Sequence, residues 1–261
     1  MFSNLASALL FVFSLFIGML LMLELGRRIG ARRRARDPQA ADVGLGTING
    51  AIFGLMGLLI AFTFSGAATR FDKRRDLVVQ EANDIGTAYL RIDLLPASAR
   101  PALRERFRRY VESRLAVYRA IPDIEAVKAK LGESNHIQAE IWRLSVASTK
   151  EVEVNGPAVT SLVLASLNDM IDITTTRTVA FQTHLPSTMV ILMAVLVLGG
   201  SLISGYELSG AKQRSLLHAI SFAVLMAGVI YIIVDLEYPR VGVIRLDQFD
   251  QALVEVRESM K

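Results

Sequence analysis

GLGTINGAIFGLMGLLIAFTFSGAA, residues Gly44–Ala68, is an apolar stretch that contains no Asp, Glu, Lys or Arg. A helix of about 20 such residues is long enough to cross the hydrocarbon core of a membrane. A charged residue near the middle would cost roughly 2.5–3.5 kcal/mol on insertion scales. The stretch is therefore predicted to be a transmembrane helix.

Three further stretches share this character, and none carries a charged residue near its middle: Leu5–Leu25, Ser187–Tyr206 and Ser215–Val234. The four stretches are arranged two and two around a long polar middle region, and 52% of all residues are hydrophobic. The pattern predicts an all-α integral membrane protein. Its four transmembrane helices form two hairpins, with a helical soluble domain between spans two and three.

The sequence divides into four expected segments. We predict a first transmembrane hairpin with an Arg-rich loop over 1–69, a helical soluble or stalk domain over 70–186, a second hairpin over 187–235, and a tail over 236–261 that packs on the soluble domain. Apolar residues recur at helical spacing through the middle region, with no alternating strand pattern. The predicted helices there continue the second span to Leu95, run from Pro101 to Pro122, cover Glu133–Thr149, follow the break at Asn155-Gly156-Pro157, and cover Gln248–Met260 with Asp247 as N-cap.

A cluster of arginines follows the first span. Positive charge in short loops marks the cytoplasmic face of a membrane, and contact with anionic lipid headgroups is a secondary effect. The second short loop, with Lys212 and Arg214, is also basic, so we expect both short loops in the cytoplasm and the soluble domain outside it. Arg70 and Lys73, directly after the second span, favour the opposite orientation, but long segments follow the rule less well than short loops. The clustered residues are Arg27, Arg28, Arg32, Arg33, Arg34 and Arg36.

Small residues form one continuous face of the second span. They are Gly50, Gly54, Gly57, Ala61 and Ser65, at steps of four and three. Such faces let helix backbones approach closely in lipid, so one hypothesis is a packing seam within the bundle or between subunits. A second hypothesis concerns the neighbouring line of Phe53, Ile60 and Phe64, which in an oligomer could line the pore as an apolar constriction that gates by dewetting.

The fourth span carries polar groups on one predicted face: His218, Ser221 and Asp235. Polar groups within a membrane usually face the bundle interior, where they can mark a permeation or proton path. The alternative interpretation is anchoring at the two membrane interfaces, because His218 and Asp235 lie near opposite ends of the span.

Nothing in the sequence favours catalysis. There is no cysteine, and the three histidines form no metal-binding motif. No nucleophile elbow and no phosphate-binding glycine loop is present, so we expect no enzyme activity, no cofactor and no metal. The Arg-rich segment Arg100–Arg119 also contains Glu105 and Glu112, and its amphipathic spacing indicates a solvated helix face instead of a nucleic-acid site.

Several short motifs resemble one family of bacterial membrane proteins, the bestrophin-like domain family, which is also catalogued as a domain of unknown function. The resemblance covers about Gly44 to Phe249. It is carried by Glu81-Ala82-Asn83-Asp84-Ile85-Gly86-Thr87-Ala88-Tyr89-Leu90, Leu94-Leu95-Pro96, Tyr110, Ile141-Trp142-Arg143-Leu144, Arg177, His184-Leu185-Pro186 and Asp235-Leu236-Glu237-Tyr238-Pro239-Arg240-Val241-Gly242-Val243-Ile244.

The resemblance implies a multi-pass protein of the bacterial inner membrane. Bestrophins are pentameric anion channels whose second span lines a narrow apolar neck, so it implies a homo-oligomer in the lipid bilayer with an anion as its partner. Two departures stand out: no acidic calcium-binding cluster is present, and the predicted soluble domain is external where bestrophins keep theirs in the cytoplasm. The alternative is a non-conducting membrane scaffold or sensor whose helical domain binds a partner.

Overall fold

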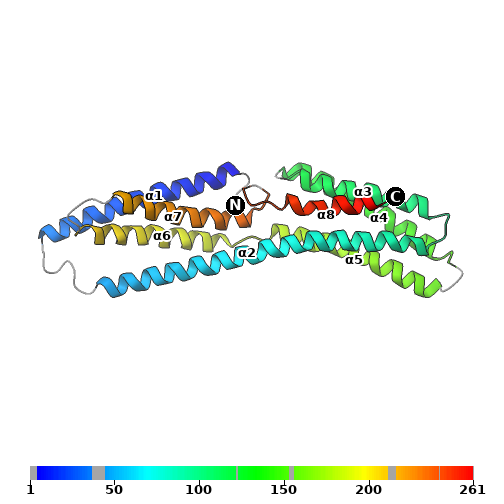
Figure 1. Cartoon of the computed structure of the whole chain (residues 1–261), viewed down its shortest axis with the longest axis horizontal. Helices are drawn as coiled ribbons and strands as arrows, with labels where there is room; N and C mark the ends of the chain where they lie inside the picture. Colours follow the sequence, from blue (N-terminus) through cyan, green and yellow to red (C-terminus); the bar gives the residue numbers. More distant parts are fainter. Residues whose placement is uncertain are drawn as a thin grey trace. The chain divides into compact units, whose positions relative to one another are not determined.

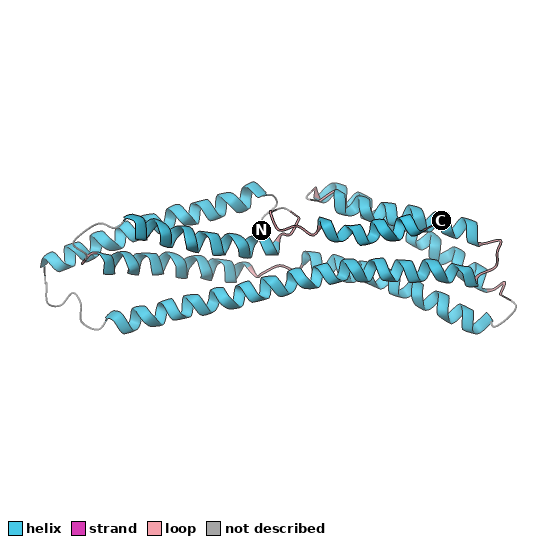
Figure 2. Ribbon diagram, viewed as in Figure 1, coloured by secondary structure: helices cyan, strands magenta, loops and turns pink. Residues whose placement is uncertain are grey.

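A computed structural model describes residues 5–36, 45–121, 123–152, 156–210, 216–240 and 242–260, and within these ranges the chain contains helices and no strands (Figures 1 and 2). The predicted all-α class is confirmed. The chain divides into two compact units. The first unit consists of Met1–Arg70 and His184–Val243, and the second of Phe71–Thr183 and Ile244–Lys261.

The first unit contains the apolar helices. They are α1 (Leu5–Arg36), the first part of α2 (Leu45–Arg91), α6 (Ser187–Leu208) and α7 (Leu216–Glu237). The described chain has four helical segments long and apolar enough to cross a membrane, as predicted. The arrangement of these segments as two hairpins in a membrane stays a prediction.

The Arg cluster is helical, where the sequence analysis placed it in a loop. Arg27 to Arg36 form the last turns of α1. Arginine is a good helix former, and positive charge is favourable at a helix C-terminus, so the helix continues through them. The second basic loop, with Lys212 and Arg214, lies outside the described residues.

Glycines bring α1 and α6 into backbone contact. A Cβ atom added at Gly26 would lie 1.9 Å from the carbonyl oxygen of Leu202, and one added at Gly205 would lie 2.0 Å from that of Leu23. Neither position can hold a larger side chain unless the two backbones separate. This close packing is on α1 and α6, which the sequence analysis did not single out.

The second unit is built around a buried core. Its helices are the rest of α2, α3 (Arg100–Arg119), α4 (Ile124–Thr149), α5 (Gly156–Gln182) and α8 (Gln251–Ser259), with short 3-10 turns η1 (Ile92–Leu94) and η2 (Asp247–Asp250). The Arg74 guanidinium donates to the carbonyl oxygens of Ala180, at 3.1 Å, and Thr183, at 2.6 Å, so it satisfies acceptors at the C-terminal end of α5. The core includes Ile85, Ile92, Leu95, Leu103, Phe107, Tyr110, Ile141, Leu167, Met170 and Leu253.

The helix ends follow the local signals with two differences. Leu95 is extended, with ψ of 163°, as the following proline requires. α4 begins earlier than predicted, because the Asp123 side chain accepts hydrogen bonds from the backbone N–H groups of Glu125 and Ala126 at 3.1 Å. The predicted cap at Asp247 is wrong: this residue begins η2 and lies 3.4 Å from the Arg245 guanidinium. Pro122 and Asn155 lie outside the described residues.

We predict that Gly26→Ala destabilises the protein, because the new methyl group would meet the Leu202 carbonyl. Overpacking of this kind costs about 1–3 kcal/mol. Thermal unfolding of the detergent-solubilised protein should show a melting temperature several degrees lower. Gly199→Ala on α6 is the control, since a Cβ there has nothing within 4 Å. Equal melting temperatures for the two variants would contradict the backbone contact.

Candidate functional site

One face of α2 packs on α6 within the first unit. Met56 lies against Gly200, and the Asn49 side-chain amide donates to the Glu207 carboxylate. Residues at seven-residue spacing return to the same helix face. The buried members of this face are Asn49, Met56, Thr63 and Ala67.

The small-residue face of α2 has no neighbour in the described chain. A Cβ added at Gly50, Gly54 or Gly57 would have nothing within 4 Å, and Ala61 and Ser65 are exposed. The described residues of one subunit therefore form no packing seam at these glycines. A seam between subunits stays a prediction.

The aromatic line of α2 lies between the buried face and the small-residue face. Phe53 and Ile60 are half-buried, whereas the Phe64 ring is 42% exposed. Phe53 packs towards α6, because its Cε1 atom would lie 3.4 Å from a Cβ at Gly200. The predicted constriction at these three residues stays a prediction.

A third face of α2 exposes large apolar side chains, and Phe62 is the most exposed of them, at 68%. Lipid contact favours a face of this kind, whereas helix–helix contact in lipid favours small residues. α2 thus has two open faces of different chemistry. The large apolar residues are Ile48, Leu55, Leu58 and Phe62.

A buried carboxylate joins three segments of the first unit. Glu237, at the end of α7, accepts a hydrogen bond of 2.7 Å from Arg70 Nε and one of 3.1 Å from the Leu185 backbone N–H. The His184 Nδ1 atom lies 3.8 Å from the same carboxylate, and the His184 ring stacks on Tyr238 at 4.5 Å. Sequence spacing predicted no role for Glu237. The available signal was that Glu237, His184 and Leu185 fall within the resembling motifs, whereas Arg70 lies outside them.

The polar residues of the fourth span are not brought together. His218 and Ser221 are exposed near the start of α7, whereas Asp235 is 5% exposed near its end. His218 and Asp235 are about 25 Å apart at the helical rise of about 1.5 Å per residue. A proton path through both residues stays a prediction.

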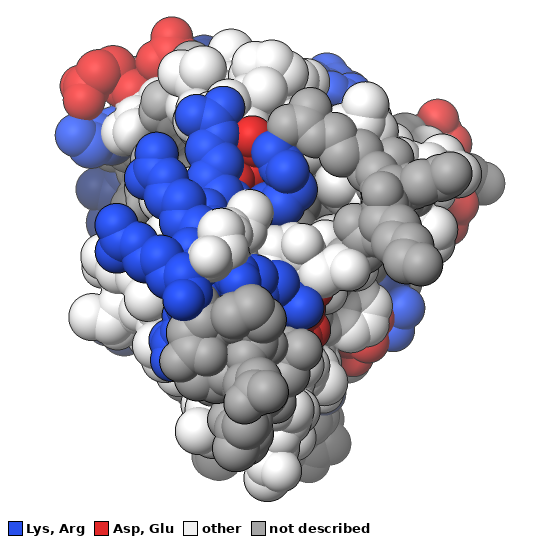
Figure 3. Space-filling model, turned by 90° about the vertical axis from the view of Figure 1, so that its left-hand side faces the viewer, with Lys and Arg blue, Asp and Glu red and all other residues white. Residues whose placement is uncertain are grey.

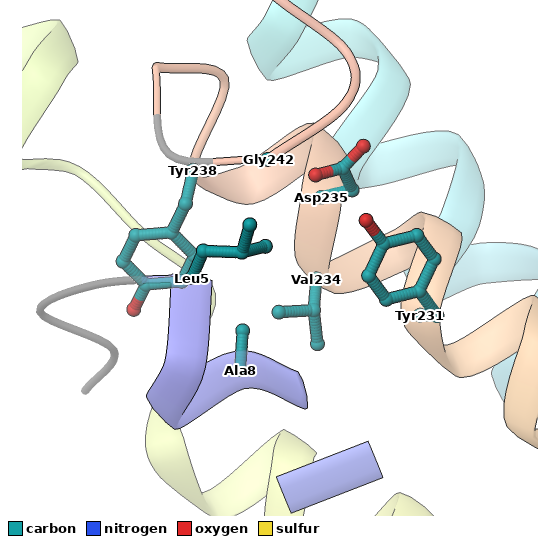
Figure 4. Close-up of a pocket in the computed structure, with 7 residues that line it drawn as sticks. All are labelled: Leu5, Ala8, Tyr231, Val234, Asp235, Tyr238 and Gly242. Atoms are coloured by element: carbon teal, nitrogen blue, oxygen red, sulfur yellow. The ribbon is translucent and has the colours of Figure 1, made fainter. Parts of the chain in front are cut away.

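Asp235 closes the turn that follows α7. Both of its carboxylate oxygens accept from the Val243 backbone N–H, at 3.0 and 3.1 Å. A Cβ at Gly242 would lie 1.3 Å from the carboxylate, so this turn requires glycine. Figure 4 shows the small pocket beside Asp235, lined by Leu5, Ala8, Tyr231, Val234, Asp235, Tyr238 and Gly242.

Basic side chains gather at the end of α1. Figure 3 shows Lys and Arg on the face that contains this end of the first unit. Arg27 and Arg28 pair with Glu24 at 2.9 and 2.8 Å, and Arg34 donates to the Ser209 hydroxyl at 3.1 Å. Contact of this cluster with lipid headgroups stays a prediction. The exposed members are Arg28, Arg32, Arg33 and Arg36.

The second unit encloses an ion network around Glu81, a fully buried residue of α2. The Glu81 carboxylate accepts from Arg114 Nε at 2.5 Å and from the Tyr118 hydroxyl at 2.8 Å, both on α3. It also accepts from Arg177 Nη1 on α5. One carboxylate therefore binds three helices together.

The surroundings of Glu81 keep it ionised. Burial alone would raise the pKa of the Glu81 carboxyl, but the positive charges of Arg114 and Arg177 and the hydrogen bonds from Arg114 and Tyr118 lower it below its ordinary value. Arg114 is only 1% exposed, so the interpretation of the Arg-rich helix as a solvated face is wrong at this position. Spacing could have shown this, since Arg114 lies four residues after Tyr110 and four before Tyr118 on the apolar stripe.

No group of three or more His, Asp or Glu side chains within the described ranges is placed to hold a metal ion. The geometry instead provides a membrane helix with open faces and two buried carboxylates that tie helices together. These features belong to helices that are joined by side-chain contacts within each of the two units.

The fold is that of bacterial bestrophin homologues. Crystal structures of three variants of such a homologue from Klebsiella pneumoniae match at TM-scores of 0.69, 0.66 and 0.65, with 13%, 13% and 14% identity. The matches cover 94%, 94% and 95% of this chain and 98%, 99% and 98% of the others. None of the curated proteins matches the chain.

The sequence model of the Bestrophin-like domain matches residues 12–248. The chain therefore belongs to the Bestrophin-like domain family. This confirms the resemblance found in the sequence motifs, and it accords with a multi-pass membrane protein.

We predict that Glu81→Gln destabilises the protein by about 3–5 kcal/mol, because loss of the carboxylate leaves two buried guanidinium groups uncompensated. Chemical or thermal unfolding at pH 7 measures this loss. The control is Glu112→Gln, which removes an exposed pair with Arg257 of 2.6 Å and should cost at most about 1 kcal/mol.

The same comparison has a pH dependence. Because the folded-state pKa of Glu81 lies below the ordinary value of 4.5, its stabilisation is present above about that pH and is lost as pH falls through the folded-state pKa. The difference between wild type and Glu81→Gln should therefore narrow below pH 4.5. A difference that stays constant into acid would contradict an ionised Glu81.

Proposed function

We propose that the chain assembles into a homo-oligomeric anion channel in the bacterial inner membrane, with α2 lining the pore. Membership of the Bestrophin-like domain family and the fold shared with bestrophin homologues support this function. The observation that carries it is the small-residue face of α2, where a Cβ at Gly50, Gly54 or Gly57 would have no atom of the described residues within 4 Å.

A second copy of the chain is the proposed partner of this face. Small residues favour close helix contact in lipid, whereas the large apolar face with Leu55 and Phe62 suits lipid. Copies related by one rotation axis would repeat the same contact around a ring, and a ring encloses an axial path. α2 would then contribute equivalent residues from every subunit.

The proposed constriction is the aromatic line. Phe64, at 42% exposure, lies beside the small-residue face, and Ile60 is one turn away. A ring of apolar side chains excludes water from a narrow path and so blocks ions until it widens. Placement of the second unit outside the cytoplasm is part of the same proposal and rests on the arginines of α1.

A non-conducting scaffold or sensor is the second candidate. The observation in its favour is the contact of Phe53 with α6, since a ring that packs within its own subunit does not line a water-filled path. On this hypothesis the spans anchor the protein and the helical second unit binds a partner.

The test is anion flux from liposomes that contain the purified full-length protein, with subunit mass measured in parallel. We predict that Phe64→Ala raises flux by about tenfold or more, because removal of the ring lowers the dewetting barrier. Phe62→Ala is the matched control, since Phe62 lies on the large apolar face of the same helix.

Unchanged flux with Phe62→Ala would support a specific constriction at Phe64. An equal rise in both variants would indicate a general leak and would contradict the constriction. A monomer without flux in wild type and Phe64→Ala would remove the channel proposal and leave the scaffold.

A further inference from the structure

The ion network of the second unit contains more hydrogen-bond donors than it uses. The Glu81 cluster is defined as Glu81, Tyr110, Arg114, Tyr118 and Arg177. Both carboxylate oxygens of Glu81 are occupied, one by Arg114 Nε and the other by the Tyr118 hydroxyl and Arg177 Nη1. Arg114 Nη2 donates to the Tyr118 hydroxyl.

Three buried donors of the cluster have no hydrogen-bond partner within the described part of the chain. They are Arg114 Nη1, Arg177 Nη2 and the Tyr110 hydroxyl. Their residues are 1%, 4% and 0% exposed. A buried donor left unpaired costs about 1–3 kcal/mol, and more when the group is charged, so three in one cluster call for an acceptor.

The third donor is a neutral phenol close to the two cations. Burial raises the pKa of Tyr110, so its hydroxyl keeps its proton at neutral pH. Tyr110 lies one helical turn before Arg114 on α3, and Arg114 and Arg177 both contact Glu81, so the three unpartnered donors belong to one buried cluster. Guanidinium groups can only donate, and thus the cluster needs an acceptor from elsewhere.

The cluster also holds an excess of positive charge. Two guanidinium groups face the single carboxylate of Glu81, which leaves one positive charge in the core. The Tyr118 ring offsets part of it, with the Arg177 and Arg114 guanidinium carbons 3.9 and 5.2 Å from its centroid. Asp84, one turn further along α2, interacts electrostatically with Glu81. Its side chain is partly exposed, so solvent screens its charge from the cluster.

We propose that the Glu81 cluster binds one small monovalent anion, of halide size, between Arg114, Arg177 and Tyr110. Such an ion accepts from all three donors and cancels the excess charge. A water molecule can accept from these donors but leaves the charge in place. Sulfate and phosphate are larger and carry more charge, which the nearby Glu81 carboxylate would repel.

The test compares the melting temperature of the full-length detergent-solubilised protein in sodium chloride and in sodium sulfate at equal ionic strength. A ligand that binds only the folded state raises the melting temperature, and we expect a rise of about 5 °C in saturating chloride. Sulfate is excluded from protein surfaces and therefore stabilises proteins in general. A higher melting temperature in chloride than in sulfate is the opposite of this general effect and therefore indicates specific binding of chloride.

Tyr110→Phe should lose most of the chloride-dependent shift. The matched control is Tyr206→Phe in the first unit, which removes another buried hydroxyl that has no hydrogen-bond partner among the described residues. It should keep the full shift. Crystals of the wild-type protein soaked in sodium bromide provide a second measurement. An anomalous peak is expected within hydrogen-bond distance of Arg114 and Arg177. This measurement tests the anion site even if Tyr110→Phe fails to fold.

Greater stability in sulfate than in chloride, together with no bromide peak in the cluster, would overturn the proposal and leave water as the acceptor. An equal loss of the shift in Tyr206→Phe would likewise overturn it. Both readouts are independent of ion flux, so a protein that conducts no ions can still show the site.

Discussion

Neutralisation of buried arginine is the constraint on which the second unit depends. Arg114 and Arg177 come from different helices, and neither can lose its charge, so the fold must supply a carboxylate where they meet. Glu81 on α2 does so from a fully buried position, and the Tyr118 ring and hydroxyl complete the contact. The network thereby connects α2 to α3 and α5 through the single carboxylate of Glu81.

The first unit follows a different constraint, because lipid gives helices no hydrophobic reason to associate. Close contact there comes from shape at Gly26 and Gly205, where backbones touch. The polar contacts of this unit include those of Glu237, at the end of α7, which accepts hydrogen bonds from Arg70 and from the Leu185 backbone N–H. α2 takes part through side chains such as Met56, whereas its glycines Gly50, Gly54 and Gly57 have no close neighbour among the described residues.

The sequence predicted which types of residue form the candidate site, but it did not predict which helices these residues contact. Small-residue spacing predicted a packing face on α2, and the structure shows only that no helix of the described chain covers its glycines. The small residues that pack within the chain also follow four-residue spacing, at Gly26 and Gly30 on α1 and at Ser201, Gly205 and Ser209 on α6, but the sequence does not show that these two helices are partners. Arg114 was included in the predicted solvated face of Arg100–Arg119 because Glu105 and Glu112 share that helix, although its own spacing placed it on the apolar stripe, where it is buried.

The sequence by itself determined the four membrane-length helices, the all-α class and most helix ends. These features depend on hydropathy, on proline positions and on the helical spacing of apolar residues, which are all properties of short stretches of sequence. Family membership was also readable from short motifs such as Glu81–Leu90. Only the tertiary structure decided which polar residues meet: Glu81 with Arg177, and Glu237 with Arg70. Such pairs join residues far apart in the chain, and a single sequence carries no signal of distance between them.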